Sequence, residues 1–170
     1  MNNKKLLYLV HAALIAAIYV VLTALAAGFD LASGAIQVRF SEALTVLPFL
    51  TPAAVPGLAI GCLLANILIG SALPDVIFGT LATLIGAVGT YALRGIARKS
   101  AKHRLLASVP PIAANALIIP FVLVYAYHIP GGIPLFMLTV GLGEVISCGI
   151  FGQALLAALS PISSKIFPAE

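Results

Sequence analysis

Charged residues are scarce in this sequence, and their scarcity excludes an ordinary soluble domain. Asp, Glu, Lys and Arg make up 8% of the 170 residues, and 62% are hydrophobic, whereas a soluble domain carries about 25% charged residues. Residues 43–74 contain no charged residue and no His. Because a hydrocarbon layer of ~30 Å needs about 20 apolar residues per helical span, this pattern predicts an integral membrane protein. Further runs without Asp, Glu, Lys or Arg cover 6–29, 76–93, 105–143 and 145–164.

Cysteine is scarce too, and tryptophan is absent. Cys62 and Cys148 lie in separate apolar segments, and we interpret them as packed thiols, since their separation gives little support to a disulfide or a metal site. Without Trp, any aromatic stacking surface must come from Phe or Tyr. The net charge of +4 comes from two short basic clusters and not from a basic face. A nucleic-acid partner is therefore not expected.

Several catalytic motifs are missing as well. The sequence has no G-x-x-x-x-G-K-[ST] phosphate loop, no G-x-S-x-G nucleophile elbow and no H-E-x-x-H pair, which removes the usual bases for ATP hydrolysis, membrane hydrolase and metalloprotease chemistry. Its two halves show no obvious inverted repeat, which argues against an ordinary secondary transporter. These absences indicate a protein that is not an enzyme and needs no cofactor. It would bind a substrate and take energy from partner subunits.

The apolar segments predict one transmembrane domain over residues 1–170, an all-α bundle of six spans. The stretch 42–70 is too long for one span and contains Pro48, Pro52 and Pro56, which block helix continuation. We therefore divide it into two spans. The predicted spans are about 6–27, 42–51, 53–70, 75–94, 105–127 and 134–158.

The basic residues predict the orientation of these spans. Lys4 and Lys5 place the N-terminus in the cytoplasm under the positive-inside rule, and six spans return the C-terminus there. The apolar run after these lysines is too long for a secretory signal, so it is expected to remain as a span. Six spans also place the basic connection inside; its cations are Arg94, Arg98, Lys99, Lys102 and Arg104.

A few polar residues lie at or below the outer surface in this arrangement. Charges within a membrane domain are costly and tend to mark pathways or ligand sites. Glu144 lies about ten residues into the last span, which at ~1.5 Å per residue is near mid-membrane. No cation of the last three spans is available at its depth, so we favour a cationic ligand for it over protonation. The other candidates for an outward-opening site are Arg39, Glu42, Asn66, Asp75, Asn115 and Tyr125.

Structural interpretations compete with several of these assignments. Asn66 and Asn115 could equally be hydrogen-bonding contacts between helices. Tyr127 fits the aromatic belt at the membrane interface better than a ligand contact, and His128 is expected to be solvated in a turn. Arg39 could simply pair with Glu42, three residues further on.

One motif resembles a known family. The run Val38-Arg39-Phe40-Ser41-Glu42-Ala43-Leu44, followed by Thr45-Val46-Leu47-Pro48-Phe49 and Gly57-Leu58-Ala59-Ile60-Gly61-Cys62, resembles the queuosine-precursor transporter (QueT) family. Residues 75–84 also look like the fourth span of that family. These proteins are similar to the substrate-binding S-components of energy-coupling factor (ECF) transporters. The resemblance extends over essentially the whole chain.

The resemblance implies a function and partners. It implies six helices in a prokaryotic plasma membrane, with a small-molecule ligand held near the outer face. The implied ligand is a deazaguanine base, in its aminomethyl form, and the implied partners are a membrane T-component and two cytoplasmic ATPases. Phe40, Phe78 and Tyr125 could supply stacking faces, and Glu42 and Glu144 could supply acids. A different vitamin-like ligand, or a structural subunit of a membrane complex, remain alternatives.

The resemblance also implies a docking motif in the first span. S-components dock on the T-component through an Ala-xxx-Ala motif in this helix, and small residues let helix backbones approach closely in lipid. Here the motif would be Ala12/Ala16 or Ala13/Ala17. The alternative is that this strip packs within the bundle, as Gly57 and Gly61 are expected to do.

Overall fold

The structure, a computed structural model, describes residues 3–29, 39–97 and 103–167, and every regular element within these ranges is a helix. The cations Arg98, Lys99 and Lys102 of the predicted basic connection lie outside them. The α-helices are α1 (Asn3–Gly28), α2 (Ala54–Leu68), α3 (Leu73–Ala97), α4 (Val109–Tyr125), α5 (Ile133–Glu144), α6 (Gln153–Leu159) and α7 (Ser163–Ile166). Three 3₁₀ segments, η1 (Phe40–Phe49), η2 (His103–Ser108) and η4 (Ser160–Ile162), and one π-helical segment, η3 (Val145–Gly152), complete the order.

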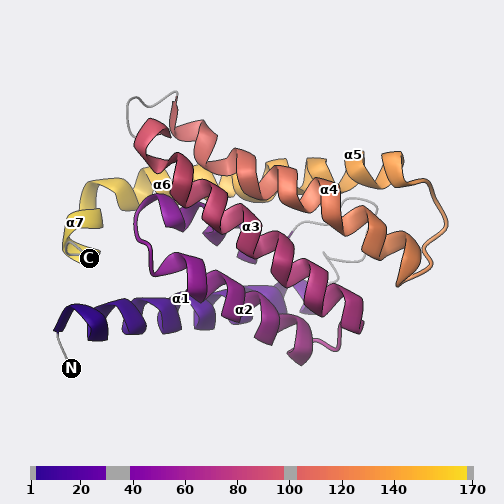
Figure 1. The fold of residues 1–170 in the computed structure, drawn as a ribbon, viewed down its shortest axis with the longest axis horizontal. Helices are drawn as coiled ribbons and strands as arrows, with labels where there is room; N and C mark the ends of the chain where they lie inside the picture. The colour runs from indigo at the N-terminus through magenta and orange to yellow at the C-terminus, as the bar shows by residue number, and fades with distance from the viewer. Residues whose placement is uncertain (1–2, 30–38, 98–102, 168–170) are drawn as a thin grey trace.

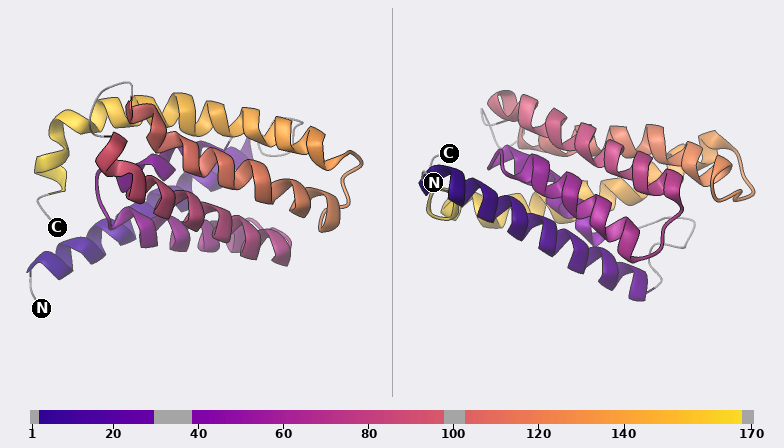
Figure 2. Two further views of the ribbon diagram at one scale, coloured as in Figure 1. Left: turned by 45° about the horizontal axis from the view of Figure 1, so that its top comes forward. Right: turned by 60° about the horizontal axis from the view of Figure 1, so that its bottom comes forward.

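The long helices run side by side along the long axis of the molecule (Figures 1 and 2). The start of α1 and the end of α7 lie at one end, and the turns between α2 and α3 and between α4 and α5 lie at the other. Contact between the His11 and Phe167 rings, whose centroids are 5.1 Å apart, ties the two chain ends together. The described helix ends that carry Lys4, Arg94 and Lys165 are at that same end.

The composition and length of the helices confirm an all-α membrane bundle. Among the described residues, four helical stretches are long and apolar enough to cross a membrane: Asn3–Gly28, Leu73–Ile96, Arg104–Tyr125 and Ile133–Ile166. Large apolar side chains are exposed on them and on α2, such as Leu68 at 71%, Leu73 at 70% and Leu138 at 62%. Such a surface suits contact with lipid. The six-span count stays a prediction.

Segment η1 is short because proline limits it. Pro48 lies inside it and Pro52 follows its end, and neither residue can donate a backbone hydrogen bond to continue a helix. The chain then turns and resumes as α2 at Ala54. Segment η1 packs against α1, α3 and η3, and eight of its ten residues are buried. A short helix with a carboxylate, Glu42, thus lies in the centre of the bundle.

Helices α1 and α2 pack backbone against backbone, which corrects one expectation about docking. A Cβ atom on Gly57 would lie 2.7 Å from the Ala12 carbonyl oxygen, and one on Gly61 would lie 3.0 Å from the Ala16 Cα. Ala12 and Ala16 are accordingly buried. This pair belongs to the core, because the glycines of α2 fill the space a partner would need. Ala13 and Ala17 lie on the exposed face.

Candidate functional site

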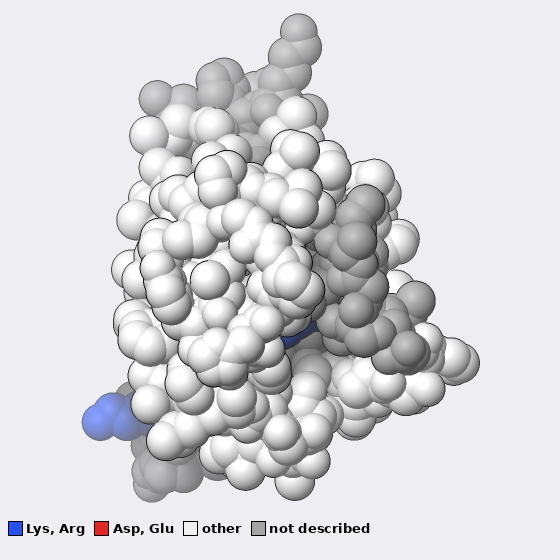
Figure 3. Space-filling model, turned by 90° about the vertical axis from the view of Figure 1, so that its right-hand side faces the viewer, with Lys and Arg blue, Asp and Glu red and all other residues white. Residues whose placement is uncertain are grey.

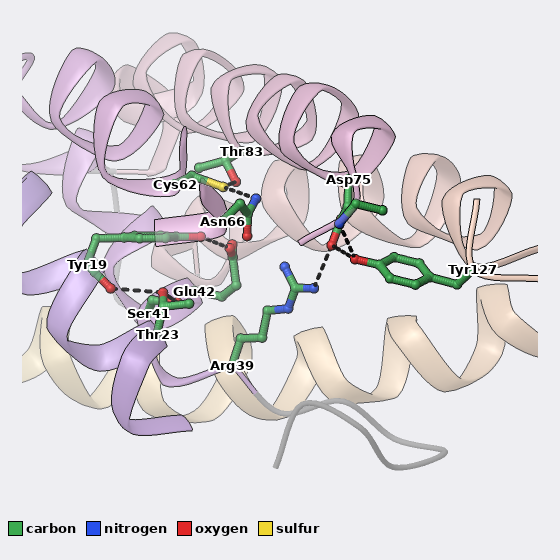
Figure 4. A network of polar contacts seen from close by, with 11 residues as sticks. Tyr19, Thr23, Arg39, Ser41, Glu42, Cys62, Asn66, Asp75, Thr83 and Tyr127 are labelled. Carbon is green, nitrogen blue, oxygen red and sulfur yellow. Dashed lines mark hydrogen bonds and ion pairs between the residues drawn. The ribbon is translucent and has the colours of Figure 1, made fainter. Parts of the chain in front are cut away.

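The centre of the site is the carboxylate of Glu42. Its side chain is 2% exposed, and the Tyr19 hydroxyl of α1 donates a hydrogen bond to its Oε1 (Figure 4). Its Oε2 is buried and has no hydrogen-bond partner. Next to it, Thr23 of α1 donates to the Ser41 hydroxyl at 2.8 Å. Helix α1 therefore fixes η1 through polar contacts, and one oxygen of Glu42 remains free to bind something else.

A second buried carboxylate lies beside the first. Glu144, at the end of α5, is 5% exposed. Cys148, one α-helical turn later in sequence, donates from Sγ to Glu144 Oε2 at 3.1 Å and contacts the Glu42 carbonyl oxygen at 3.3 Å. Ligand atoms of Glu42, Glu144 and Cys148 all lie within 4.8 Å of one another. Two buried carboxylates this close cannot both be charged without a cation between them.

The two asparagines approach this centre from α2 and α4. Asn66 is 1% exposed, and its Nδ2 lies 3.5 Å from Cys62 Sγ, which also accepts from Thr83 Oγ1 at 3.4 Å. Asn115 is 4% exposed and lies beside the Glu42 carboxylate, although its Nδ2 donates to Pro111 O in its own helix at 3.2 Å. Both of these hydrogen bonds lie within the amide's own helix and do not link two helices. Both amides are buried near the polar centre, so a ligand contact stays a prediction for each.

A second polar group lies nearer the end where α2 meets α3. Arg39 Nη2 is 3.9 Å from Asp75 Oδ2, and the Tyr127 hydroxyl donates to the same oxygen at 3.0 Å while accepting from the Ala72 amide at 3.1 Å. Asp75 also lies in the first turn of α3, where the helix dipole favours a negative charge.

This chain of contacts changes two expectations from the sequence. Arg39 pairs with Asp75 and not with Glu42, so neither buried carboxylate forms an ion pair within the described part of the chain. From the sequence, Tyr127 is expected in the aromatic belt at the membrane interface, but its hydroxyl also links the start of α3 to the turn after α4 through hydrogen bonds. The residue before η1 (Arg39), the start of α3 (Asp75) and the turn after α4 (Tyr127) therefore meet beside the Glu42 centre (Figure 4).

The aromatic candidates do not gather at the carboxylates. Phe78 is 46% and Tyr125 67% exposed, and both line an apolar groove of about 610 Å³ between α3 and α4 whose walls contain no acid. Phe40 packs against Phe151 with ring centroids 5.9 Å apart. Of these three residues, Phe40 is closest in sequence to the polar centre, because it directly precedes Ser41 and Glu42.

The end of the molecule above this centre is hollowed. Figure 3 views the end where α2 meets α3 and α4 meets α5, and a basic side chain is visible at the base of a hollow there. No acidic side chain appears on this face among the atoms described. Glu42, Asp75 and Glu144 are buried below this surface.

Comparison with known families decides what kind of protein carries this site. The model of the QueT transporter family matches residues 9–161. The chain belongs to the QueT transporter family. No curated protein and no solved structure matches it. Membership gives this QueT-family protein a transport role in a membrane and a small-molecule substrate.

Several residues of the QueT-family site were missed by sequence reasoning, although patterns pointed to them. Tyr19 and Thr23 continue the inward face of α1 that begins with Ala12 and Ala16, because residues three and four apart share a helix face. Cys148 follows Glu144 by four residues and shares its face for the same reason. The contacts of both groups with η1 depend on how distant segments pack, and no local pattern encodes that.

Proposed function

We propose that this protein is the substrate-capture subunit (S-component) of an ECF-type importer. It binds a queuosine precursor, the aminomethyl form of a deazaguanine base, and partner subunits drive uptake: a membrane T-component and two cytoplasmic ATPases. The observation that carries the substrate proposal is the pair of buried carboxylates, Glu42 and Glu144, which have no ion-pair partner among the described residues. An ammonium group from the ligand would supply the missing positive charge.

The remaining polar groups suit the rest of such a ligand. A planar base needs hydrogen-bonding partners on its edge and an apolar or aromatic face to stack on. The free Oε2 of Glu42 and the amides of Asn66 and Asn115 supply the first, and Phe40 can supply the second. Arg39 and Asp75 would close the site above. Phe78 and Tyr125 would contact lipid or a partner in place of the base, because they line the separate apolar groove.

We infer the orientation in the membrane from the positions of the chain ends. Contact between His11 and Phe167 holds the two ends of the chain on one side, which favours an even number of spans. The basic helix ends lie on that side as well, so the positive-inside rule would make it cytoplasmic. We therefore propose six spans in a prokaryotic plasma membrane, with the Glu42 centre open to the outside.

The docking motif is reduced to one pair. With Ala12 and Ala16 buried against α2, the T-component would meet the exposed Ala13/Ala17 pair of α1. Large apolar side chains flank this pair on the same exposed surface, including Leu9, Leu14 and Val21. Small residues within such a surface admit a partner helix at close range.

The decisive experiment is to identify the bound ligand. The protein is purified in mild detergent from cells that make deazaguanine bases, and the extract of the denatured protein is analysed by ultraviolet absorbance and mass spectrometry. The expected result is one equivalent of the aminomethyl base. A different vitamin-like compound in that extract would keep the capture role and overturn the substrate. An extract with no small molecule, together with no binding of added base, would favour a structural subunit.

A further inference from the structure

We propose that Glu42, Glu144 and Cys148 form a binding site for a divalent metal ion of borderline softness, of which Zn²⁺ is the reference. The three ligand atoms come from η1, α5 and η3 and lie within 4.8 Å of one another. All three side chains are buried, with exposures of 2%, 5% and 0%. The sequence alone gave the cysteines no such role, because their wide separation resembles no metal-binding spacing.

An independent observation points to a ligand at this cluster. The Oε2 atom of Glu42 is buried without a hydrogen-bond partner, and an unsatisfied buried carboxylate oxygen carries a large desolvation cost. The other oxygen of Glu42 is already held by Tyr19. The free atom therefore lacks a partner that a cation would supply. Arg39 does not serve, since its guanidinium pairs with Asp75.

The chemistry of the three ligands selects the ion. Two carboxylate oxygens and one thiolate sulfur match the ligands that Zn²⁺ accepts, whereas Mg²⁺ and Ca²⁺ prefer oxygen alone. Cys148 Sγ and Glu144 Oε2 are 3.1 Å apart, and Zn–S and Zn–O bonds of ~2.3 and ~2.1 Å bring two ligands of one ion to a comparable separation. The last side-chain torsion of Glu42 is weakly restricted, and small rotations about it would bring a carboxylate oxygen to bonding distance as the third ligand.

The charge and proton balance of this site are simple. The thiol S–H bond breaks, its proton leaves to solvent, and the sulfur electron pair forms the bond to the metal. No oxidant or reductant takes part. Two carboxylates and one thiolate carry three negative charges, which a divalent ion largely neutralises. Three protein ligands leave a fourth position open, as in zinc sites that exchange water or substrate.

The π-helical turns after Glu144 contribute to the site. Segment η3 begins at Val145 and contains Cys148, and π-helical turns inside longer helices occur frequently at functional sites. The thiol also lies 3.3 Å from Thr45 Oγ1 of η1. Cys148 is thus held between η1 and the end of α5, in a position to complete the ligand set.

The metal site shares Glu42 and Glu144 with the proposed base site, so the metal ion and the ammonium group of the base are alternative occupants of the two carboxylates, and the metal is tested without base. The full-length protein in detergent is freed of metal by a chelator and titrated with Co²⁺, whose bond to a thiolate gives a near-ultraviolet charge-transfer band. We expect this band to saturate at one Co²⁺ per chain and to disappear when Zn²⁺ is added. A wild-type protein that gives no thiolate band would overturn the proposal.

Two cysteine variants assign the band. Cys148→Ser is expected to lose it and to bind Co²⁺ more than about tenfold more weakly. Cys62→Ser is the matched control: Cys62 is as buried as Cys148, at 1% exposure, but lies outside the cluster. The control is expected to keep both the band and the affinity. A band that survives Cys148→Ser, or that vanishes with Cys62→Ser, would contradict the site.

A second variant covers the case in which Cys148→Ser does not fold. Glu144→Gln keeps the thiol and the side-chain volume, and it is expected to weaken Co²⁺ binding by a similar factor while the band persists at saturation. Unchanged affinity in this variant would remove Glu144 from the site. The metal and base proposals fail separately. A base found by mass spectrometry without Co²⁺ binding overturns only the metal site, and the reverse outcome overturns only the base.

Discussion

At the scale of single residues, the site depends on how one buried carboxylate is held. Tyr19 donates to Glu42, and a hydrogen bond to a charged group contributes about 1.5–3 kcal/mol. That is less than the several kcal/mol that burial of an ion costs. Glu42 therefore cannot be ionised on the strength of Tyr19 alone. The nearby Arg39 guanidinium and the Asn115 amide also favour the charged carboxylate, and a ligand cation, or a proton shared with Glu144, would supply the rest.

Glu144 is the residue whose charge the proposed ligand should need most. Loss of one partner from a desolvated charge pair costs about 2–5 kcal/mol, and each 1.4 kcal/mol is a factor of about ten in affinity. Glu144→Gln should therefore weaken binding of the aminomethyl base by well over tenfold, measured by calorimetry on the purified protein.

The control for this variant is the ligand. A deazaguanine base without the aminomethyl group carries no cation, so its affinity should change little between the wild type and Glu144→Gln. Equal loss for both bases would indicate a structural fault. Unchanged binding of the cationic base in a folded variant would remove Glu144 from the site.

The hydroxyl of Tyr127 should stabilise the outer end of the bundle by a modest amount. Tyr127→Phe removes the bond to Asp75 and the acceptor for the Ala72 amide, and each such bond contributes about 0.5–1.5 kcal/mol. The expected result is a lower unfolding temperature in a detergent-based thermal assay. Tyr125→Phe is the matched control, because that ring is 67% exposed in the apolar groove and should tolerate the change.

At the scale of elements, α1 has one face that packs within the bundle and another that is exposed and is proposed to bind a partner. Ala16 lies against the backbone of α2 at Gly61, whereas Ala17 is exposed one residue later. Ala16→Trp should therefore disrupt the bundle and reduce ligand binding. Ala17→Trp should leave ligand binding intact and abolish copurification with the T-component and ATPases. The two variants differ by one position, so each controls for the effect that a bulky side chain in α1 has in the other.

Opposite outcomes would reverse this assignment. If Ala16→Trp bound the base normally and lost only its partners, the α1–α2 contact would not be essential core. If Ala17→Trp assembled normally, the docking surface would lie elsewhere on the exposed apolar face.

The sequence could predict the helices better than their inner geometry. Long runs without charge mark α1 and α3, and the prolines at 48, 52 and 56 indicate a break between η1 and α2. The 3₁₀ form of η1 and the π-helical turns of η3 are different, since they depend on packing in the centre of the bundle. Glu144 could be recognised as exceptional by its depth. Its neighbour Glu42 could not, because η1 must first fold inward.

At the scale of the whole molecule, the proposed topology can be tested on described residues. His128 lies in the exposed turn between α4 and α5, and Lys165 lies near the C-terminal end in α7. With single cysteines at these positions, a membrane-impermeant maleimide added to intact cells should label His128→Cys and spare Lys165→Cys. Both should react after the cells are opened. Labelling of Lys165→Cys in intact cells would reject a cytoplasmic C-terminus, and failure to label His128→Cys in intact cells would reject an outer position for the turn between α4 and α5.

Cys62 and Cys148 need not be removed for that experiment. Both are free thiols that are almost fully buried, so the wild-type protein should give no signal in either intact or opened cells. Reaction of the wild-type protein would instead report that the bundle opens enough to expose one of them.

The π-helical turns of η3 make the last long helix sensitive to the length of the chain. The i→i+5 hydrogen bonds of η3 accommodate extra residues within the helix, so η3 changes the rotational register between α5 and α6. If these turns became α-helical without the loss of a residue, the two parts would rotate by about 100° relative to each other, since each α-helical turn takes 3.6 residues. Glu144 would then face the centre only if Gln153 released its contacts with Arg104 O and Ser108 Oγ. In this region substitutions that force α-helical geometry at unchanged chain length should be far more damaging than conservative exchanges of one apolar side chain for another.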